Sequence, residues 1–119
     1  SGVVYHASYL RFMERGRSDF LRLIGVHHRE LAEGEESLAF AVRAMELTFH
    51  RPARIDDVVE IETAVRAIEG ARIILRQAVR LGEVVLVEAV VTAVLVNAAG
   101  KPRRLPAILR SRLAPAASP

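Results

Sequence analysis

Residues 7–24 read ASYLRFMERGRSDFLRLI, and this stretch decides how the rest of the chain must fold. Its apolar residues recur at intervals of three and four, the period of one face of an α-helix. They are Tyr9, Phe12, Met13, Gly16, Phe20, Leu23 and Ile24. Charged residues fill the opposite face, namely Arg11, Glu14, Arg15 and Arg22. The spacing therefore predicts one long helix from Ala7 to Ile24.

Two glycines and one valine indicate where this helix ends and what it packs against. Gly25 follows its last turn and is expected to adopt the left-handed conformation that ends a helix, with Val26 as the hydrophobic residue beyond it. Gly16 lies inside the helix, where glycine costs roughly 1 kcal/mol relative to alanine. Its presence there predicts a close approach of the helix to a sheet.

The remaining chain predicts strands. In residues 38–49 the apolar alternation changes phase, which predicts a bulge between Arg43 and Met45. A turn at 51–57 leads to a strand that begins at Val59 and is closed by Glu69 and Gly70. The next strand runs from Arg72 to Leu81, and Gly82-Glu83 makes a tight hairpin to residues 84–97. Together with the helix, these strands predict an α+β fold in a single domain over residues 1–119.

The strand at 84–97 is apolar at nearly every position, as expected when a strand is covered on both faces. The helix can cover one face of the sheet, and a second subunit is the simplest cover for the other. Residues 107–113 are expected to form a short terminal helix, and residues 114–119 a frayed tail.

Composition narrows the class of protein. The 119 residues include no cysteine, so neither a disulfide framework nor a thiolate metal site is expected. The longest apolar run, 84–96, is too short to cross a bilayer and no signal peptide precedes it, which predicts a soluble protein. The net charge of +3 favours an anionic partner, although the arginine-rich and alanine-rich usage can also simply reflect genomic base composition. Aromatic residues are not interleaved with basic ones, so a nucleic-acid partner is not expected.

The opening SGVVYHASYLRFMERGRSDFLR resembles the start of the Tol-Pal-associated, YbgC-type acyl-CoA thioesterases, relatives of the 4-hydroxybenzoyl-CoA thioesterases. Further similar segments are RPARIDD at 51–57 and GKPRRLP at 100–106. The resemblance implies a hotdog fold, in which an antiparallel sheet wraps around one central helix. It also implies a homodimer or homotetramer paired edge to edge, with sites at the subunit interface, and a cytoplasmic enzyme without metal or other cofactor.

The same resemblance identifies candidate site residues. His6 matches a family position at the start of the central helix, where a backbone N–H and the helix dipole can stabilise the oxyanion of a thioester. Its side chain is a catalytic candidate, although it could merely satisfy backbone groups. Tyr5 could orient substrate or pack as an aromatic, and Val4 belongs to the substrate-binding motif.

The carboxylate of the family lies a few residues before the glycine of this motif. That position precedes Ser1, and so does the expected first strand, which suggests a piece of a longer protein. Glu14, two turns beyond His6, is the fallback base, with a surface ion pair as its alternative role. Asp56 and Asp57 are interpreted as turn-forming residues. The four histidines have no metal-site spacing.

Lys101, Arg103 and Arg104 follow the last strand and could bind the phosphates of coenzyme A, or could form a solvated basic loop. The sequence thus predicts an acyl-CoA thioesterase that releases a free acid and CoA. The alternative is a non-catalytic hotdog module that binds acyl-CoA, an acyl carrier protein or an envelope-associated partner. A hotdog dehydratase is disfavoured, because its arrangement of histidine and acidic residue is not seen.

Overall fold

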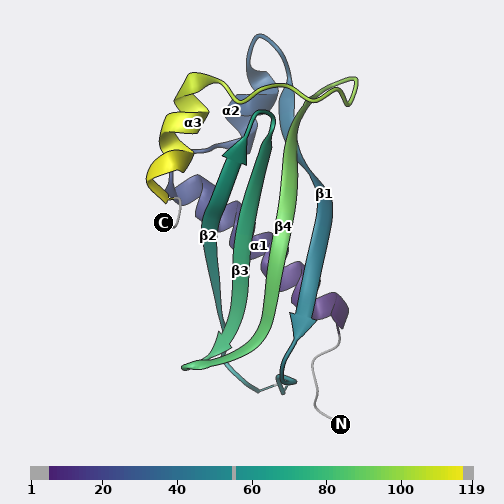
Figure 1. Ribbon diagram of the computed structural model, residues 1–119, viewed down its shortest axis with the longest axis vertical. Coiled ribbons are helices and arrows are strands. Elements are labelled where there is room, and N and C mark those ends of the chain that lie inside the picture. Colours follow the sequence, from purple (N-terminus) through teal and green to yellow (C-terminus); the bar gives the residue numbers. More distant parts are fainter. Residues whose placement is uncertain (1–5, 55, 117–119) are drawn as a thin grey trace.

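The computed structural model describes residues 6–54 and 56–116, with side chains from Ser8 to Pro115. Figure 1 shows one sheet with a long helix, α1, running diagonally across it and shorter helices at one end. The elements are α1 (His6–Leu23), α2 (His28–Glu33), β1 (Leu38–Phe49), β2 (Glu60–Glu69), β3 (Arg72–Leu81), β4 (Val84–Asn97), α3 (Ala107–Leu113) and η1, a 3-10 turn (Ala114–Ala116). The predicted α+β class is confirmed.

The predicted long helix is confirmed, with bounds shifted by one residue at each end. Gly25 has a φ of +87°, the left-handed conformation expected after its last turn. The buried face, however, is rotated from the predicted one. Tyr9, Met13 and Leu21 are buried, whereas Phe12 and Leu23 are exposed. The helical spacing of apolar residues located the helix correctly. It did not identify the buried face, because apolar residues also lie on exposed positions beside that face.

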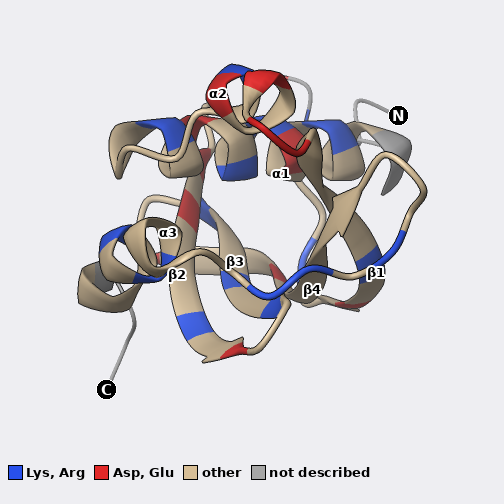
Figure 2. Ribbon diagram, turned by 90° about the horizontal axis from the view of Figure 1, so that it is seen from above, with Lys and Arg blue, Asp and Glu red and all other residues tan. Residues whose placement is uncertain are grey.

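All four strands are antiparallel, in the order β1-β4-β3-β2. The predicted hairpin joins β3 to β4 at Gly82, whose φ of +59° suits a tight turn. The predicted bulge is confirmed as well, since the pairing of β1 with β4 shifts between Val42 and Ala44. Viewed from above, the sheet curves around the side on which α1 and α2 lie (Figure 2).

The core lies between α1 and the curved sheet. On β4 the residues that face the helix are all buried: Val87, Ala89, Val91, Ala93 and Leu95. On its outer face Glu88, Val90 and Thr92 remain partly exposed. The apolar run predicted that both faces of this strand are covered. Within one chain, the outer face of this stretch of β4 is only partly covered.

Gly16 is the point at which α1 comes closest to the sheet. A Cβ atom added there would lie 2.6 Å from Cγ2 of Ile61 on β2, far inside van der Waals contact. The close approach predicted from this glycine is confirmed. It fixes how far α1 is shifted along its axis relative to β2.

The C-terminal segment closes one end of the core. Leu109 and Leu113 of α3 are buried, and the guanidinium of Arg112 donates a hydrogen bond of 2.6 Å to the carbonyl of Gly25. The expectation of a frayed tail from Ala114 is wrong for its first three residues, which form η1 as a continuation of α3. None of the described helices is long and apolar enough to cross a membrane.

Candidate active site

The start of α1 is held against the far end of β1. The buried hydroxyl of Tyr9 accepts a 2.7 Å hydrogen bond from the backbone N–H of Ala53. Its ring meets that of Phe49 edge to face, with centroids 5.8 Å apart and an interplanar angle of 61°. Tyr9 lies one helical turn after His6, so these contacts set where the first turn sits.

The turn that receives Tyr9 is stabilised by its own carboxylate. Asp57 accepts a 2.8 Å hydrogen bond from the N–H of Arg54 and donates its own N–H to the carbonyl of Arg54 at 3.0 Å. The turn-forming role predicted for Asp57 is thereby confirmed, while Asp56 is exposed. This local closure orients the N–H of Ala53 toward α1.

Of the predicted site residues in the first motif, His6 is the first residue of α1. Its side chain, together with Val4 and Tyr5, lies outside the described residues. The first turn of α1 contains no acidic residue. Its backbone N–H groups and the positive end of the helix dipole are therefore not offset by a carboxylate within that turn, which suits binding of an anion or oxyanion.

Sequence reasoning missed a second anchor in the middle of α1. Gln77 on β3 is fully buried, and its Nε2 donates to the carbonyl of Met13 at 2.9 Å and to Oγ1 of Thr63 at 3.0 Å. Its Oε1 accepts a 3.0 Å bond from Arg17. Burial lowers the pKa of Arg17, and the charge of Glu14 partly offsets that effect. One signal was available: Gln77 occupies a position in phase with the apolar residues Ile73, Leu75 and Val79.

Grooves run along both sides of α1. The groove toward β1 has a volume of about 270 Å³ and is lined by Glu14, Arg17 and Val42 among others. The groove toward β2 has a volume of about 560 Å³ and includes Phe12, Gly16 and Ile61. Glu14, the fallback base, is exposed and lies eight residues beyond His6, about 12 Å along the helix. It is therefore not placed at the helix start.

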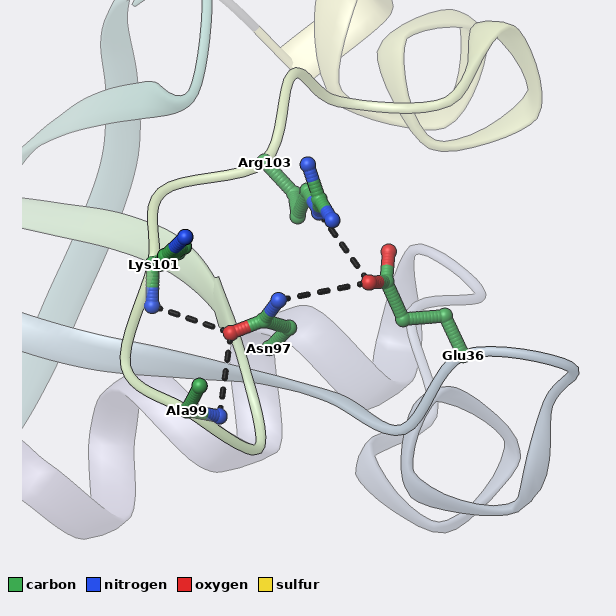
Figure 3. A network of polar contacts seen from close by, with 5 residues as sticks. All are labelled: Glu36, Asn97, Ala99, Lys101 and Arg103. Atoms are coloured by element: carbon green, nitrogen blue, oxygen red, sulfur yellow. Dashed lines mark hydrogen bonds and ion pairs between the residues drawn. The ribbon is translucent and has the colours of Figure 1, made fainter.

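The basic segment lies at the opposite end of β1. Lys101, Arg103 and Arg104 are exposed, and Nε of Arg103 forms a 3.0 Å ion pair with Glu36. Asn97 binds the same carboxylate at 3.3 Å, and its Oδ1 accepts the N–H of Lys101 at 3.0 Å (Figure 3). The predicted substrate-binding cations are thus brought together with one another, but not with the helix start of the same chain.

No cluster of three or more histidine, cysteine or acidic side chains that could hold a metal occurs in the described part of the chain. The chemistry that the described residues offer consists of the amides of a first helical turn without acidic residues, hydrogen-bonding groups and cations.

The profile of the Thioesterase superfamily matches residues 1–88. The chain belongs to this superfamily. The acyl-CoA thioester hydrolase YbgC of Escherichia coli is 41% identical over 109 residues, which cover 88% of this chain and 78% of the relative. The acyl-CoA thioesterase YbgC of Haemophilus influenzae is 36% identical over 96 residues, covering 81% and 70%. The resemblance predicted from the motifs is confirmed.

Solved structures agree with this family. A probable thioesterase from Bartonella henselae superposes with a TM-score of 0.83 at 51% identity, covering 88% of this chain and 86% of that one. The hotdog fold expected for the thioesterase superfamily is thus confirmed, with α1 as its central helix. Thioester hydrolysis, the predicted class of reaction, is confirmed at the level of this family.

Proposed function

We propose that this chain hydrolyses an acyl-CoA thioester to a free acid and CoA. The main support is its similarity to relatives named as acyl-CoA thioesterases, which extends over most of both chains. The helix start adds a physical reason, because the first turn of α1 holds no acidic residue and lies at the motif that resembles the family site.

In the proposed reaction, a water oxygen ends bonded to the carbonyl carbon, and the bond from that carbon to the sulfur of CoA breaks. Negative charge develops on the carbonyl oxygen, where the amides of the first helical turn stabilise it. The resemblance implies two roles for the family's carboxylate. It either removes a proton from the attacking water, or attacks the carbonyl carbon itself to form an anhydride that water then hydrolyses to the free acid. His6 transfers a proton to the departing thiolate, since histidine titrates near neutral pH.

The proposal includes the other roles that the resemblance implies. Val4 and Tyr5 line the substrate near His6, and Lys101, Arg103 and Arg104 bind CoA phosphates. The chain assembles as a homodimer or homotetramer and acts in the cytoplasm, where acyl-CoA esters are made and used. An acyl carrier protein or an envelope-associated protein is a further partner to test.

The test measures free thiol released from a series of acyl-CoA esters by the purified protein. Because the chain contains no cysteine, released CoA is its only source of thiol signal. We expect turnover with at least one ester, and a loss of about 10²-fold in kcat for His6→Ala. The matched control is His27→Ala, an exposed residue just beyond the other end of α1, which should retain full activity.

Binding of acyl-CoA without any turnover would replace the enzyme by the alternative binding module. Equal activity of His6→Ala and the native protein would remove His6 from the mechanism, while leaving the helix amides in place.

A further inference from the structure

We infer that Glu36 is a positioning residue for CoA binding, because it holds the guanidinium of Arg103 in the orientation that binds a phosphate. This inference rests on the proposed function, in which the basic segment binds the phosphates of CoA. It adds two things to that proposal. It ranks Arg103 first among the three cations, and it gives a part to an acidic residue outside the segment.

The backbone of the basic segment is built into the sheet. The N–H of Asn97, the last residue of β4, donates to the carbonyl of Lys101 at 3.0 Å. Two residues later the N–H of Arg103 donates to the carbonyl of Leu95 at 2.8 Å, and Pro102 between them forms a bridge to β4. The backbone that carries Lys101 and Arg103 therefore has a fixed place at the end of β4.

The side chain of Asn97 ties this segment to Glu36. Its Oδ1 accepts the N–H groups of Ala99 and Lys101, both at 3.0 Å, and its Nδ2 donates to the carboxylate of Glu36 at 3.3 Å. Glu36 precedes β1 by two residues, and Leu38, the first residue of β1, pairs with Asn97. The register of the sheet thus brings Glu36 to the basic segment.

Glu36 orients one side chain of the segment. Its Oε2 accepts a hydrogen bond of 3.0 Å from Nε of Arg103 (Figure 3). Within the described part of the chain, the two terminal nitrogens of Arg103 have no partner, and the side chains of Lys101 and Arg104 form no hydrogen bond or ion pair. A guanidinium grips a phosphate through two parallel N–H groups. Glu36 therefore fixes the plane of this fork and leaves its open side free.

The other acidic residues of the same loop do not share this contact. Glu33 pairs with Arg29 at 3.3 Å, and Glu35 is exposed without an ion pair among the described residues. The contact of Glu36 with Arg103 is thus specific, and not a general attraction between an acidic loop and a basic one.

Positioning and plain electrostatics predict opposite effects for Glu36. Its carboxylate brings a negative charge close to the proposed phosphate site, so an effect of charge alone would make CoA bind more tightly once that charge is removed. If Glu36 positions Arg103, its removal frees the guanidinium to rotate and CoA binds more weakly. The sign of the change therefore decides between the two.

The experiment titrates CoA into the purified protein and its variants by calorimetry. We expect Arg103→Ala to raise the Kd of CoA about tenfold. Glu36→Ala should raise it about three- to fivefold, as fits an ion pair whose side chains are 49% and 45% exposed. Glu36→Gln keeps an oxygen that accepts from Nε, so its Kd should stay within about twofold of native. Tighter binding by Glu36→Ala overturns the inference, as does a native protein that binds no CoA.

A double-mutant cycle tests whether Glu36 acts through Arg103. Once Arg103 is replaced by alanine, Glu36→Ala should have no further effect on the Kd of CoA, because there is no guanidinium left to orient. Additive losses in the double variant would overturn the inference. The matched control is Glu35→Ala, which removes the neighbouring carboxylate and should keep the native Kd.

A kinetic comparison excludes a merely structural role. With an acyl-CoA ester, Glu36→Ala should raise KM and leave kcat unchanged, whereas kcat/KM for the matching pantetheine ester, which lacks phosphates, should equal the native value. An equal fall with both esters would mean that Glu36 only maintains the fold.

The inference and the proposed function can fail separately. CoA binding that depends on Glu36, in a native protein that releases no thiol from any ester, would reject hydrolysis and keep the positioning role. Native turnover together with a Kd that is unchanged in Glu36→Ala would reject the positioning role and keep hydrolysis.

Discussion

The two faces of the sheet handle polar side chains in opposite ways. On the face toward α1, Gln77 is fully buried, and its side-chain hydrogen bonds join it to Met13 and Arg17 of α1 and to Thr63 of β2. On the outer face, Glu88 forms contacts of 3.3 Å with Arg76 and 3.5 Å with His50, and all three side chains are well exposed. If a side chain on the outer face loses its hydrogen-bond partner, water can take that partner's place. On the buried face toward α1 it cannot.

Because water cannot reach the face toward α1, the few contacts that hold the helix in place are costly to lose. No disulfide can fasten the helix to the sheet beneath it, because the chain contains no cysteine. Its shift and rotation depend on Gly16, Tyr9 and Gln77, which lie at its closest approach, near its start and beneath its middle, respectively. Charged pairs on the outer face add little to that placement.

The largest effect is expected for Gln77→Ala. This change opens a cavity and leaves Arg17 and the buried carbonyl of Met13 without their amide partner. We expect a loss of about 3–5 kcal/mol in the free energy of unfolding, measured by chemical denaturation. Gln77→Met, which keeps the volume, should recover part of it. A loss below about 1 kcal/mol for Gln77→Ala would show that water reaches this position after all.

A smaller effect on stability, but a direct one on activity, is expected for Tyr9→Phe. The ring remains, while the buried N–H of Ala53 loses its acceptor, at a cost of about 1–3 kcal/mol. Because the first turn of α1 is then less well held, kcat should fall about tenfold with little change in KM.

Thr63→Val is the matched control for that change. It also removes one hydroxyl that bonds to an α1 anchor, but at the middle of the helix. It should lower stability and leave kcat unchanged. Equal kcat losses in the two variants would mean that Tyr9 acts through general stability rather than through the position of the helix start.

The smallest effect is expected on the outer face, for Glu88→Gln. A hydrogen bond from His50 is the main cause that lowers the pKa of Glu88; desolvation opposes it, and the hydrogen bond and the charge of Arg76 lower the pKa further. A carboxylate with a lowered folded-state pKa adds stability above its ordinary pKa and loses it as pH falls through the folded-state value. Thermal melts should therefore show a slight difference from the native protein at neutral pH that vanishes in acid. A large difference at neutral pH would contradict the contrast between the faces.

Much of the fold could be predicted because helices and strands follow from the spacing of apolar residues along short stretches of the chain. The bounds of β3, β4 and α3 and the bulge at Arg43 agree with the sequence reading. The candidate site was predictable only in part. The motif around His6 pointed to the helix start through resemblance, and the basic segment was found by its charge. Their separation could not be predicted, because it depends on the direction in which β1 runs past both.

The helix, the strands, their turns and the family could be read from the sequence, since each is encoded by spacing or by residues close together in the chain. The packing of the elements was needed to bring Tyr9 to Ala53 and Gln77 to Met13 and Arg17, and to place Lys101 far from the helix start. Those contacts join residues 44 to 64 positions apart. No local period specifies such pairs, because they depend on how complete elements pack across one another.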